Sequence, residues 1–310
     1  MMAIHHDIET LLAPQTTVEQ QCALIKKLSG YQYQGAALAD IVTAFRAHEC
    51  RVVGLPNATV DIVGTGGDGV NTLNYSTMAA LLLMRMGIPV AKHGNKSATS
   101  LCGSFDLLLK LGMTIPETPE QAEAVFNEQG GVFLFAPYFH PIFKRIAAAR
   151  KHFSDKGERT IFNVLGPLLN PAHVSRMVIG VYQPELVRPF AEALVALGCD
   201  YAYVVHGDGL DEASLTGMTQ FARCDHGKIM YGEWQPEDFG FKQCSLAALK
   251  GGDPAYNLQQ TQAILSGELT GPKQQMVVIN AALAVHASQG FSCTLQDCVH
   301  KVLQSMNKRV

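Results

Sequence analysis

Residues 61–77 read Asp61-Ile-Val-Gly-Thr-Gly-Gly-Asp-Gly-Val-Asn-Thr-Leu-Asn-Tyr-Ser-Thr77. The stretch begins as a short apolar run, turns through four glycines between positions 64 and 69, and continues into a segment that suits a buried helix. A strand, a glycine turn and a helix in this order present backbone N–H groups and a helix N-terminus to an anion. Glycine also lets the backbone approach a phosphate closely. The sequence therefore predicts a phosphate-bearing ligand at this turn.

Two common phosphate-binding patterns fit this turn poorly. Gly64-x-Gly66-x-x-Gly69 has the glycine spacing of dinucleotide-binding proteins, but that pattern also requires an acidic residue about 20 positions further on. The next expected strand, residues 88–91, is followed by Lys92 and His93 instead, and a cation there favours additional phosphate. No Gly-Lys-Ser/Thr follows the glycines, so the sequence contains no Walker loop here.

Length and composition bound the possible functions. The chain has 310 residues, of which 47% are hydrophobic and 16% are charged, and its net charge is −3. This length can bury a large core, and this charge gives no basic field for binding nucleic acid. The 8 cysteines are scattered without metal-ligand spacing, which predicts reduced thiols in a cytoplasmic protein. No apolar run reaches the roughly 18 residues of a membrane span, and we expect no signal peptide.

The periodicity of the chain changes near residue 60. Two helices, 18–28 and 36–48, predict a small helical domain over residues 1–55, joined by part of 142–170. From Asp61 onward strands and helices alternate, which predicts a large α/β domain over residues 56–310 with a mainly parallel central sheet. The other expected strands are 88–91, 132–135, 177–182, 201–205 and a pair within 219–232. The other expected helices are 76–86, 104–111, 118–130, 142–153, 185–197, 257–266, 274–288 and 294–305.

Polar groups gather in four loops that are expected at the carboxyl ends of the strands, namely 64–77, 92–104, 136–140 and 206–212. Open α/β sheets bind their ligands at this edge. The adjacent carboxylates Asp211 and Glu212 suit Mg²⁺ that is held partly by the phosphate oxygens of a substrate. No Ser-His-Asp or Cys-His arrangement can be assigned, so no residue is assigned as a catalytic acid or base. The pattern alone predicts metal-assisted chemistry on a phosphorylated or pyrophosphorylated substrate.

A series of motifs between residues 61 and 212 carries a resemblance to a known family. The motifs are Asp61–Gly69, Asn74–Thr77, Val90–Asn95, Gly103-Ser104, Phe133–Pro137, His140-Pro141, Arg159–Asn163, Gly166–Leu168, Asn170-Pro171, Gly180–Tyr182, Val204–Gly207 and Asp211-Glu212. Taken in this order, they resemble the motifs of the anthranilate phosphoribosyltransferases. That family makes N-(5-phosphoribosyl)anthranilate from anthranilate and phosphoribosyl pyrophosphate (PRPP) in tryptophan biosynthesis, and it releases pyrophosphate.

The resemblance implies a fold, an assembly and a set of site residues. It implies a small helical domain plus a large α/β domain, related to the pyrimidine nucleoside phosphorylases, and a homodimer through the N-terminal helices. It places the PRPP contacts on Gly64, Gly67, Asp68, Thr72, Asn74, Tyr75, Ser76, Thr77, Lys92, His93, Gly94, Asn95, Lys96, Ser97, Ala98, Thr99, Ser100 and Ser104. It places Mg²⁺ on Ser76, Asp211 and Glu212. It places the anthranilate contacts on Gly64, His93, Asn95, His140 and Arg150.

Three features depart from the family pattern. Lys96 stands where the family has arginine, and lysine keeps the charge without the planar fork of a guanidinium. The segment between Arg150 and Arg159 is longer than usual, which leaves Arg145 and Arg159 as alternatives to Arg150 for the carboxylate of anthranilate. The N-terminal helical region is shorter than usual, so we expect a weaker dimer than is typical of the family.

Two other functions share parts of this pattern. A pyrimidine nucleoside phosphorylase-like enzyme has the same fold and a glycine turn, but it handles free phosphate and a nucleoside. The Asp211-Glu212 pair, Asn95 and Arg150 disfavour it. A non-catalytic nucleic-acid-binding relative is expected to lose the glycine turn and to gain basic surface, and this sequence does neither.

Overall fold

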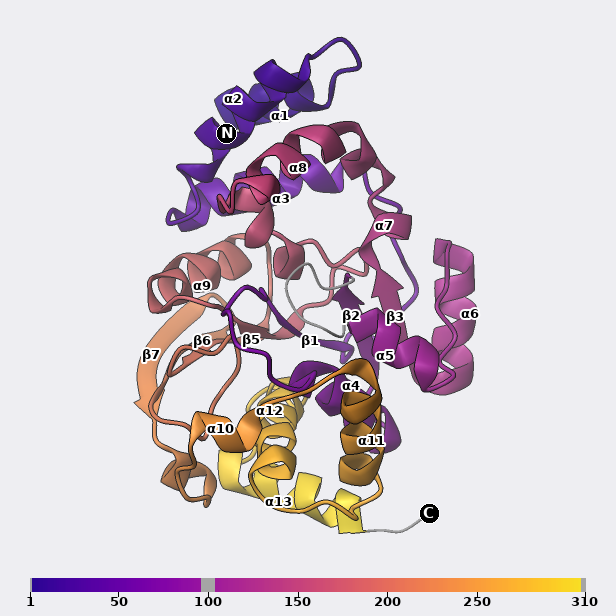
Figure 1. Cartoon of the computed structure of the whole chain (residues 1–310), viewed down its shortest axis with the longest axis vertical. Coiled ribbons are helices and arrows are strands. Elements are labelled where there is room, and N and C mark those ends of the chain that lie inside the picture. Colours follow the sequence, from indigo (N-terminus) through magenta and orange to yellow (C-terminus); the bar gives the residue numbers. More distant parts are fainter. Residues whose placement is uncertain (1, 96–103, 308–310) are drawn as a thin grey trace.

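The computed structural model describes residues 2–95 and 104–307, except for the side chain of residue 307. Strands and helices alternate through most of this part of the chain (Figure 1). The strands are β1 (Val60–Gly64), β2 (Val90–Gly94), β3 (Gly131–Phe135), β4 (Arg176–Gly180), β5 (Tyr201–Gly207), β6 (Thr219–Asp225) and β7 (Lys228–Trp234). The α-helices are α1 (Met2–Leu12), α2 (Val18–Ser29), α3 (Gly35–Arg46), α4 (Tyr75–Arg85), α5 (Ser104–Lys110), α6 (Pro119–Gln129), α7 (Ala136–Phe139), α8 (Ala147–Asp155), α9 (Val187–Ala196), α10 (Leu246–Leu249), α11 (Pro254–Leu265), α12 (Pro272–Ser288) and α13 (Leu295–Asn307).

The described strands form one sheet in the order β3-β2-β1-β4-β5-β6-β7. The strands from β3 to β5 in this order are parallel, and β6 and β7 extend the sheet as an antiparallel hairpin. The predicted α/β fold with a mainly parallel sheet is therefore confirmed. Because the carboxyl ends of the parallel strands meet at one edge, the loops that were predicted to bind the ligand leave the sheet on the same side.

The central strands are buried on both faces, as parallel strands must be. Val63 and Ile179 point to the face that is covered by α9, and α3 packs on α9 with α1, α2 and α8 further out. Ile62 and Val178 point to the opposite face, which is covered by α4 and α12. In Figure 1 the N-terminal helices lie at one end of the molecule, and α12 and α13 lie at the other, with the sheet between them.

Helix α1 is a correction to the sequence analysis, which predicts no helix before residue 16. Ile4, Ile8, Leu11 and Leu12 repeat at helical spacing and are buried against the other N-terminal helices. The helix has no polar N-cap signal and carries two adjacent histidines, so its periodicity was the one available sign.

Other boundaries follow from local chemistry. Thr118 caps α6 by accepting the Gln121 N–H, and Gly130 ends the helix with a φ of 72°, as the sequence predicts. The helix expected over 142–153 instead begins as a 3₁₀ segment, Pro141–Ile146, before α8 takes over. Within the described residues, no helix combines the length and the apolar character that crossing a bilayer demands.

Candidate active site

The glycine turn joins β1 to α4 at the carboxyl edge of the sheet. Gly66 and Gly67 have φ angles of 68° and 80°, in the left-handed region where a side chain would be strained. The N–H of Thr65 donates to the Gly180 carbonyl at 2.9 Å, and its hydroxyl accepts the Tyr182 N–H at 3.1 Å. These bonds tie the turn to the end of β4, so the strand, turn and helix predicted from the sequence form a fixed unit.

The loop that carries Asp211 and Glu212 lies directly against the ends of three neighbouring strands. Strands β1, β4 and β5 each end in a glycine. A Cβ atom on Gly180 would lie 1.6 Å from the Asp211 carbonyl oxygen, and one on Gly207 would lie 2.3 Å from the Glu212 carbonyl oxygen. One on Gly64 would lie 2.1 Å from the Asp211 carboxylate. The loop can reach this position only because these three residues have no side chain.

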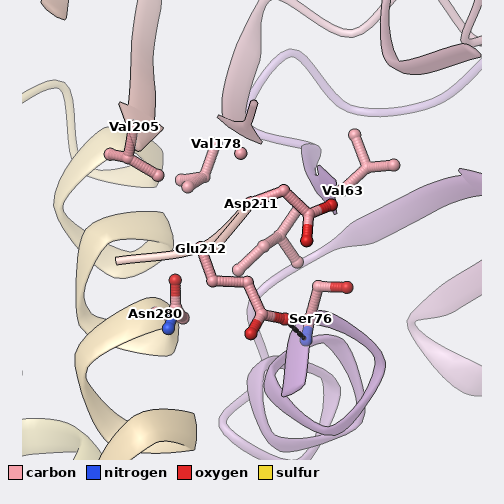
Figure 2. A pocket seen from close by; sticks show the side chains of 9 residues that line it. Val63, Ser76, Val178, Val205, Asp211, Glu212 and Asn280 are labelled. Atoms are coloured by element: carbon pink, nitrogen blue, oxygen red, sulfur yellow. Dashed lines mark hydrogen bonds between the residues drawn. The ribbon is translucent and has the colours of Figure 1, made fainter. Parts of the chain in front are cut away.

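The two adjacent carboxylates share one pocket, which Figure 2 shows with Ser76 and Asn280 at its wall. Asp211 Oδ2 accepts the Gly66 N–H at 2.6 Å, and Glu212 Oε1 accepts the Ser76 N–H at 3.3 Å. Both side chains therefore turn toward the glycine turn and the N-terminus of α4, although neighbouring residues usually point in different directions.

Negative charge is crowded at this pocket. Burial, followed by the charge of the nearby Asp68 carboxyl, raises the pKa of Asp211 to about 7. Burial, followed by the charges of Asp211 and Asp68, raises the pKa of Glu212 well above its usual value. Burial also raises the pKa of Asp68. Burial thus disfavours the charged form of all three carboxyl groups, repulsion adds to this at Asp211 and Glu212, and a bound cation would offset this cost.

The donor set fits a divalent cation that arrives with a phosphorylated ligand. Among the described residues, no group of three or more His, Cys, Asp and Glu side chains is arranged to hold a metal by itself. Ser76 contributes a hydroxyl beside the two carboxylates of Asp211 and Glu212. Mg²⁺ prefers one or two carboxylates and completes its shell with phosphate oxygens and water. These residues therefore suit Mg²⁺ bound together with a phosphate better than a metal ion held by protein ligands alone.

Lys92 lies beneath the pocket. Its side chain is 4% exposed, and its Nζ donates to the Ile62 carbonyl and to Ser76 Oγ, the latter at 3.3 Å. Burial lowers the pKa of Lys92, whereas nearby carboxylates, Asp61 first among them, act in the opposite direction. Burial raises the pKa of Asp61 to about 6, and Lys92 opposes this shift. Lys92 is therefore a buried counter-charge behind Ser76, in contrast to the free phosphate-binding cation that was expected.

His93 and His140 form a neutral pair next to the glycine turn, with ring centroids 5.2 Å apart. His93 Nδ1 donates to the Gly166 carbonyl at 3.0 Å, and His140 Nε2 donates to the Leu169 carbonyl at 2.8 Å. Burial lowers the pKa of His93 to about 3 and also lowers that of His140, so both rings are uncharged near neutral pH. His93 Nε2 and His140 Nδ1 have no hydrogen-bond partner among the described residues. Each remaining nitrogen is an acceptor for an N–H of a ligand.

Arg150 extends the site away from the turn. Its guanidinium lies 5.2 Å from the ring centroid of Phe162 and 5.9 Å from that of Phe143. Phe143 in turn contacts the ring of His140, with centroids 5.6 Å apart. Burial lowers the pKa of Arg150, and no ion pair to this residue occurs in the part of the chain that the structure describes. Arg150 is a partly buried cation that can accept a carboxylate partner.

Comparisons with known proteins agree with this geometry. A family model described as the α/β domain of a glycosyl transferase family matches residues 56–308. An anthranilate phosphoribosyltransferase from Chlorobium phaeobacteroides is 39% identical over 300 residues, which cover 94% of this chain and 84% of that protein. The chain belongs to the anthranilate phosphoribosyltransferase family. Another member, from Trichlorobacter lovleyi, is 47% identical over 230 residues, which are 74% of this chain but slightly less than two thirds, 65%, of that protein's length.

Solved structures of anthranilate phosphoribosyltransferases share the fold. The structure from Thermus thermophilus has a TM-score of 0.89 and 36% identity, and the match covers 98% of this chain and 89% of that one. The Saccharomyces cerevisiae structure in complex with PRPP and Mg has a TM-score of 0.84 and 28% identity, covering 98% of this chain and 87% of that one. These similarities support the anthranilate phosphoribosyltransferase interpretation and give no support to the nucleoside phosphorylase or nucleic-acid-binding alternatives.

The remaining residues that the anthranilate phosphoribosyltransferase family implies are fully buried, exposed, partly exposed or outside the described part of the chain. Tyr75 is fully buried and its hydroxyl donates to the Leu249 carbonyl at 3.0 Å, so we assign it to the core instead of to PRPP. Thr77 is also fully buried, whereas Asn95 is exposed at the end of β2. Partly exposed positions at the same edge are Thr72, Asn74, Gly94 and Ser104. The residues outside the described part of the chain are Lys96, Ser97, Ala98, Thr99 and Ser100.

Two residues shape this anthranilate phosphoribosyltransferase-like site in roles that were not predicted. Asn280 of α12 donates to the Ala213 carbonyl at 2.9 Å and accepts the Ala213 N–H at 3.0 Å, which clamps the loop just after the carboxylate pair. Arg159 lies 4.0 Å from the ring centroid of Tyr182 and donates to the Gly67 carbonyl, which supports the turn from outside. A lone polar residue in the apolar middle of a helix, residues 276–285, and an arginine within a family motif were the available signals.

Proposed function

We propose that this protein transfers the 5-phosphoribosyl group of PRPP to the amine of anthranilate and releases pyrophosphate, a step of tryptophan biosynthesis. One observation carries the proposal: the glycine turn after β1 and the histidine pair, whose His93 lies near the end of the neighbouring strand β2, lie at the same edge of the sheet. The glycine turn with Asp211 and Glu212 suits a magnesium-bound pyrophosphate. The neutral histidine pair with Arg150 suits an aromatic ring that carries one amine and one carboxylate.

The PRPP half is assigned to the glycine turn and the neighbouring strand ends. The N–H groups of Gly66 and Ser76 already bind the carboxylates of Asp211 and Glu212, so the rest of the turn supplies the donors for phosphate. Lys92 acts from behind by holding the Ser76 hydroxyl. The proposed PRPP contacts among the described residues are Gly64, Gly67, Asp68, Thr72, Asn74, Ser76, Thr77, His93, Gly94, Asn95 and Ser104.

Ser76, Asp211 and Glu212 are the residues that would hold Mg²⁺. When bound there, the ion would neutralise charge on the pyrophosphate as it leaves. The chain itself keeps the two carboxylates together. Burial and repulsion from neighbouring carboxyl groups oppose their charged forms and raise the pKa of both.

The anthranilate half is assigned to Gly64, His93, Asn95, His140 and Arg150. A carboxylate placed beside the partly buried guanidinium of Arg150 would form a charge-assisted pair, and Phe143 and Phe162 would cover the aromatic ring. The amine would donate its two N–H groups to His93 Nε2 and His140 Nδ1. These two hydrogen bonds would turn the nitrogen lone pair toward the ribose.

The reaction depends on positioning more than on acid–base chemistry. The C1–O bond of PRPP breaks with oxocarbenium-like character, and the amine attacks from the opposite face. An aniline nitrogen is largely unprotonated at neutral pH, so no base is needed before attack. Holding the two reactants in line supplies the main rate enhancement. The new C1–N bond replaces the C1–O bond, pyrophosphate leaves with the electron pair, and the amine nitrogen then releases one of its two protons to solvent.

The direct test is the loss of anthranilate fluorescence when the protein is mixed with PRPP and Mg²⁺. Pyrophosphate should appear in equal amount, and omission of PRPP should stop both changes. If anthranilate is not consumed, the proposed reaction is wrong. Phosphorolysis of thymidine by the same preparation would instead favour a pyrimidine nucleoside phosphorylase.

The carboxylate pair gives a sharper test of the metal site. Changing Asp211→Asn together with Glu212→Gln should lower turnover by at least about 100-fold, because a catalytic metal contributes several kcal/mol. Circular dichroism should show that the double variant remains folded. Asp200→Asn, a carboxylate at the opposite end of β5, is the matched control and should remain active. An active double variant, or full activity in excess chelator, would remove this metal site from the proposal.

The proposal also covers the division into domains, the oligomeric state and the cellular location. Residues 1–55, with part of 142–170, would form a small helical domain, and residues 56–310 would form the large α/β domain. The contacts among α1, α2 and α8 support the first unit. A homodimer would form through the N-terminal helices. The protein would act in the cytoplasm, and the free state of the described cysteines fits a reducing compartment.

A further inference from the structure

The segment from Gly166 to His173, which we call the strap, passes behind both histidines of the candidate site. Its Gly166 carbonyl accepts the Nδ1 proton of His93 at 3.0 Å, and its Leu169 carbonyl accepts the Nε2 proton of His140 at 2.8 Å. A carbonyl can only accept, so it fixes which nitrogen of a neutral ring keeps the proton. The strap therefore decides which ring nitrogen faces the substrate.

The middle of the strap is fixed to the sheet. Asn170 Nδ2 donates to Asp61 Oδ2 at 2.8 Å and to the Ala91 carbonyl at 2.7 Å, so it bridges β1 and β2. The Val52 N–H donates to the Pro171 carbonyl at 3.0 Å. These bonds fix the middle of the strap. The position of its ends relative to the two histidines depends on other contacts.

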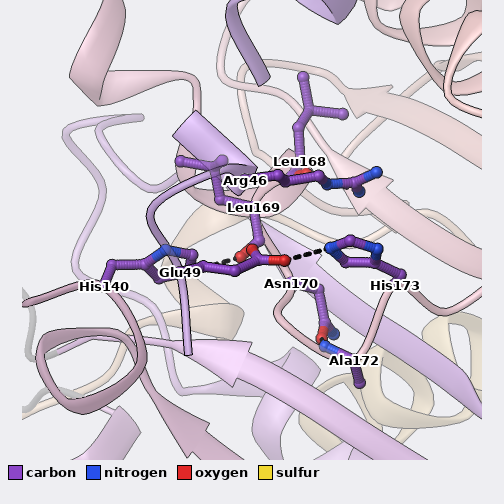
Figure 3. Close-up of polar contacts among 8 residues, drawn as sticks. All are labelled: Arg46, Glu49, His140, Leu168, Leu169, Asn170, Ala172 and His173. Carbon is purple, nitrogen blue, oxygen red and sulfur yellow. Dashed lines mark hydrogen bonds and ion pairs between the residues drawn. The ribbon is translucent and has the colours of Figure 1, made fainter. Parts of the chain in front are cut away.

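A second anchor comes from the short segment after α3 (Figure 3). The carboxylate of Glu49 pairs with His173 Nε2 at the end of the strap, and Arg46 donates to the Leu168 carbonyl at 3.3 Å. The Glu49 side chain is 1% exposed and that of His173 is 22% exposed. Figure 3 shows Glu49 between the rings of His140 and His173. The second half of the strap is thus tied to the N-terminal helical region.

This anchor is a costly way to gain stability. A buried carboxylate must recover its lost hydration through its partner, and an apolar pair of similar volume often stabilises a protein as well or better. His173 also has a φ of 45°, a left-handed conformation that a non-glycine residue adopts only when the surroundings impose it. The best attested role of buried polar or charged groups is to fix register, and the register that this pair fixes is that of the strap.

We propose that the hydrogen-bonded pair Glu49–His173 is a positioning device for His140. The pair holds the strap where the Leu169 carbonyl binds His140 Nε2, so that His140 Nδ1 stays turned toward the amine of the acceptor substrate. Glu49 and His173 touch no substrate in this scheme. The inference rests on the proposed function, and it assigns the effect of the pair to the anthranilate half of the site and not to the PRPP half.

The kinetic test uses Glu49→Gln, which keeps the shape of the side chain, and His173→Asn, which suits a positive φ. Each should raise the KM for anthranilate on the order of 10-fold, the lower end of the effect seen when the partner of an oriented histidine is removed. The KM for PRPP should change by less than about 2-fold, since the glycine turn keeps its contacts. Asp200→Asn is the matched control, because it removes a carboxylate–histidine pair, Asp200–His226, that is exposed at the far edge of the sheet.

A second measurement does not depend on activity. NMR spectra of nitrogen-labelled histidine should show His140 protonated at Nε2 in the wild type, with the signal assigned through His140→Gln. In Glu49→Gln and His173→Asn, the same signal should move toward a mixture of the two tautomers. If wild-type protein does not consume anthranilate, the proposed function fails, and these spectra still decide whether the pair positions His140.

Two results would overturn the inference. One is unchanged anthranilate kinetics and unchanged His140 spectra in both variants. The other is an equal rise of both KM values together with a lower Tm, which would make the pair a general element of the fold. If Glu49→Gln fails to fold, His173→Asn still gives the test, because His173 is partly exposed and its replacement leaves no larger side chain to accommodate.

Discussion

Arg150 is the residue that we propose to bind the carboxylate of anthranilate. The sequence leaves Arg145 and Arg159 as alternatives, but in the structure both are committed elsewhere. Arg145 donates to the Leu12 carbonyl at 3.0 Å, and Arg159 donates to the Gly67 carbonyl. Arg150 instead lies over Phe162 without an ion pair in the described residues. The geometry therefore favours the assignment that the resemblance implies.

The corresponding prediction separates the two substrates. Arg150→Ala should cost about 1.5–3 kcal/mol in anthranilate-dependent steps, because it removes one charge-assisted pair. This is about 10- to 150-fold in kcat/KM for anthranilate, and the KM for PRPP should change little. Lys151→Ala is the control, since Lys151 is exposed on the same helix and pairs only with Asp155 in the described structure. Unchanged anthranilate kinetics in Arg150→Ala would show that the carboxylate binds elsewhere.

His93 makes the stability of the protein depend on pH. Burial, followed by the effect of His140, lowers its pKa to about 3, whereas an unfolded histidine titrates near about 6.5. Between these values the unfolded chain binds a proton that the folded chain does not. The contribution of His93 is therefore complete above about pH 6.5 and is lost as the pH falls.

We expect the wild type to lose stability relative to His93→Gln by up to about 1.4 kcal/mol per pH unit below about pH 6. Urea unfolding of both proteins between about pH 7 and pH 4.5 measures this difference. Asp61 has the opposite sign, because its raised pKa of about 6 means that its contribution is lost as the pH rises toward that value. It is common to both proteins and cancels in the comparison. A constant difference across the range would contradict the neutral, buried state of His93.

At the scale of elements, the loop after β5 shows how the site depends on backbone fit. Gly180→Ala places a methyl group where the Asp211 carbonyl lies, so the loop with both carboxylates must move. A displacement of about 1 Å at reacting groups can cost about 100-fold in rate, and we expect a loss of this size in kcat/KM. The variant should also lose about 1–3 kcal/mol of stability through overpacking.

Gly30→Ala is the control for that experiment. Gly30 has a φ of −64° at the end of α2, and a Cβ there would meet only the Lys27 carbonyl, at 3.2 Å. It should keep full activity in the anthranilate fluorescence assay. A fully active Gly180→Ala protein would mean that the loop can be seated without the glycine, and the close contact would then have no catalytic consequence.

Most elements of the large α/β region could be predicted, because each is encoded by nearby residues. Strand β1 and helix α4 are separated by glycines, and α6 is bounded by Thr118 and Gly130, so periodicity and caps gave their ends to within a few residues. Helix α1 was missed because its signal was four apolar residues without a cap. The 3₁₀ start of the helix after His140 was missed because it depends on packing that no local pattern describes.

At the scale of the whole molecule, the site contains partners that sequence could not pair. Glu49 and His173 are far apart in the chain, as are Asn280 and Ala213, yet each pair supports the same sheet edge. Such contacts follow from the order of the strands and the packing of the N-terminal helices on the sheet. The sequence predicted the residue types that are proposed to bind phosphate, and it could not predict which buried groups hold them in place.

The strength of the proposed homodimer depends on how much apolar surface the N-terminal helices leave exposed. Ile4, Ile8, Leu11, Ile25 and Leu28 are buried inside the protomer, which leaves few apolar side chains of α1 and α2 for a partner. The large exposed ones are Met2 and Val18, with 90% and 47% of their surface accessible. A stable interface needs about 800 Å² from each partner and an apolar centre, so this surface supports only a weak dimer.

We therefore expect a dimer through these helices to dissociate in the micromolar range, which corresponds to about −8 kcal/mol of association free energy. Light scattering across a dilution series measures it. Val18→Glu should shift dissociation to higher concentration, because it places a charge on the remaining apolar surface. Met230→Glu on the edge strand β7, where Met230 is 53% exposed, is the control and should leave the midpoint unchanged. A dimer that persists at nanomolar protein, or one that responds to Met230→Glu instead, would place the interface on a different surface from α1 and α2.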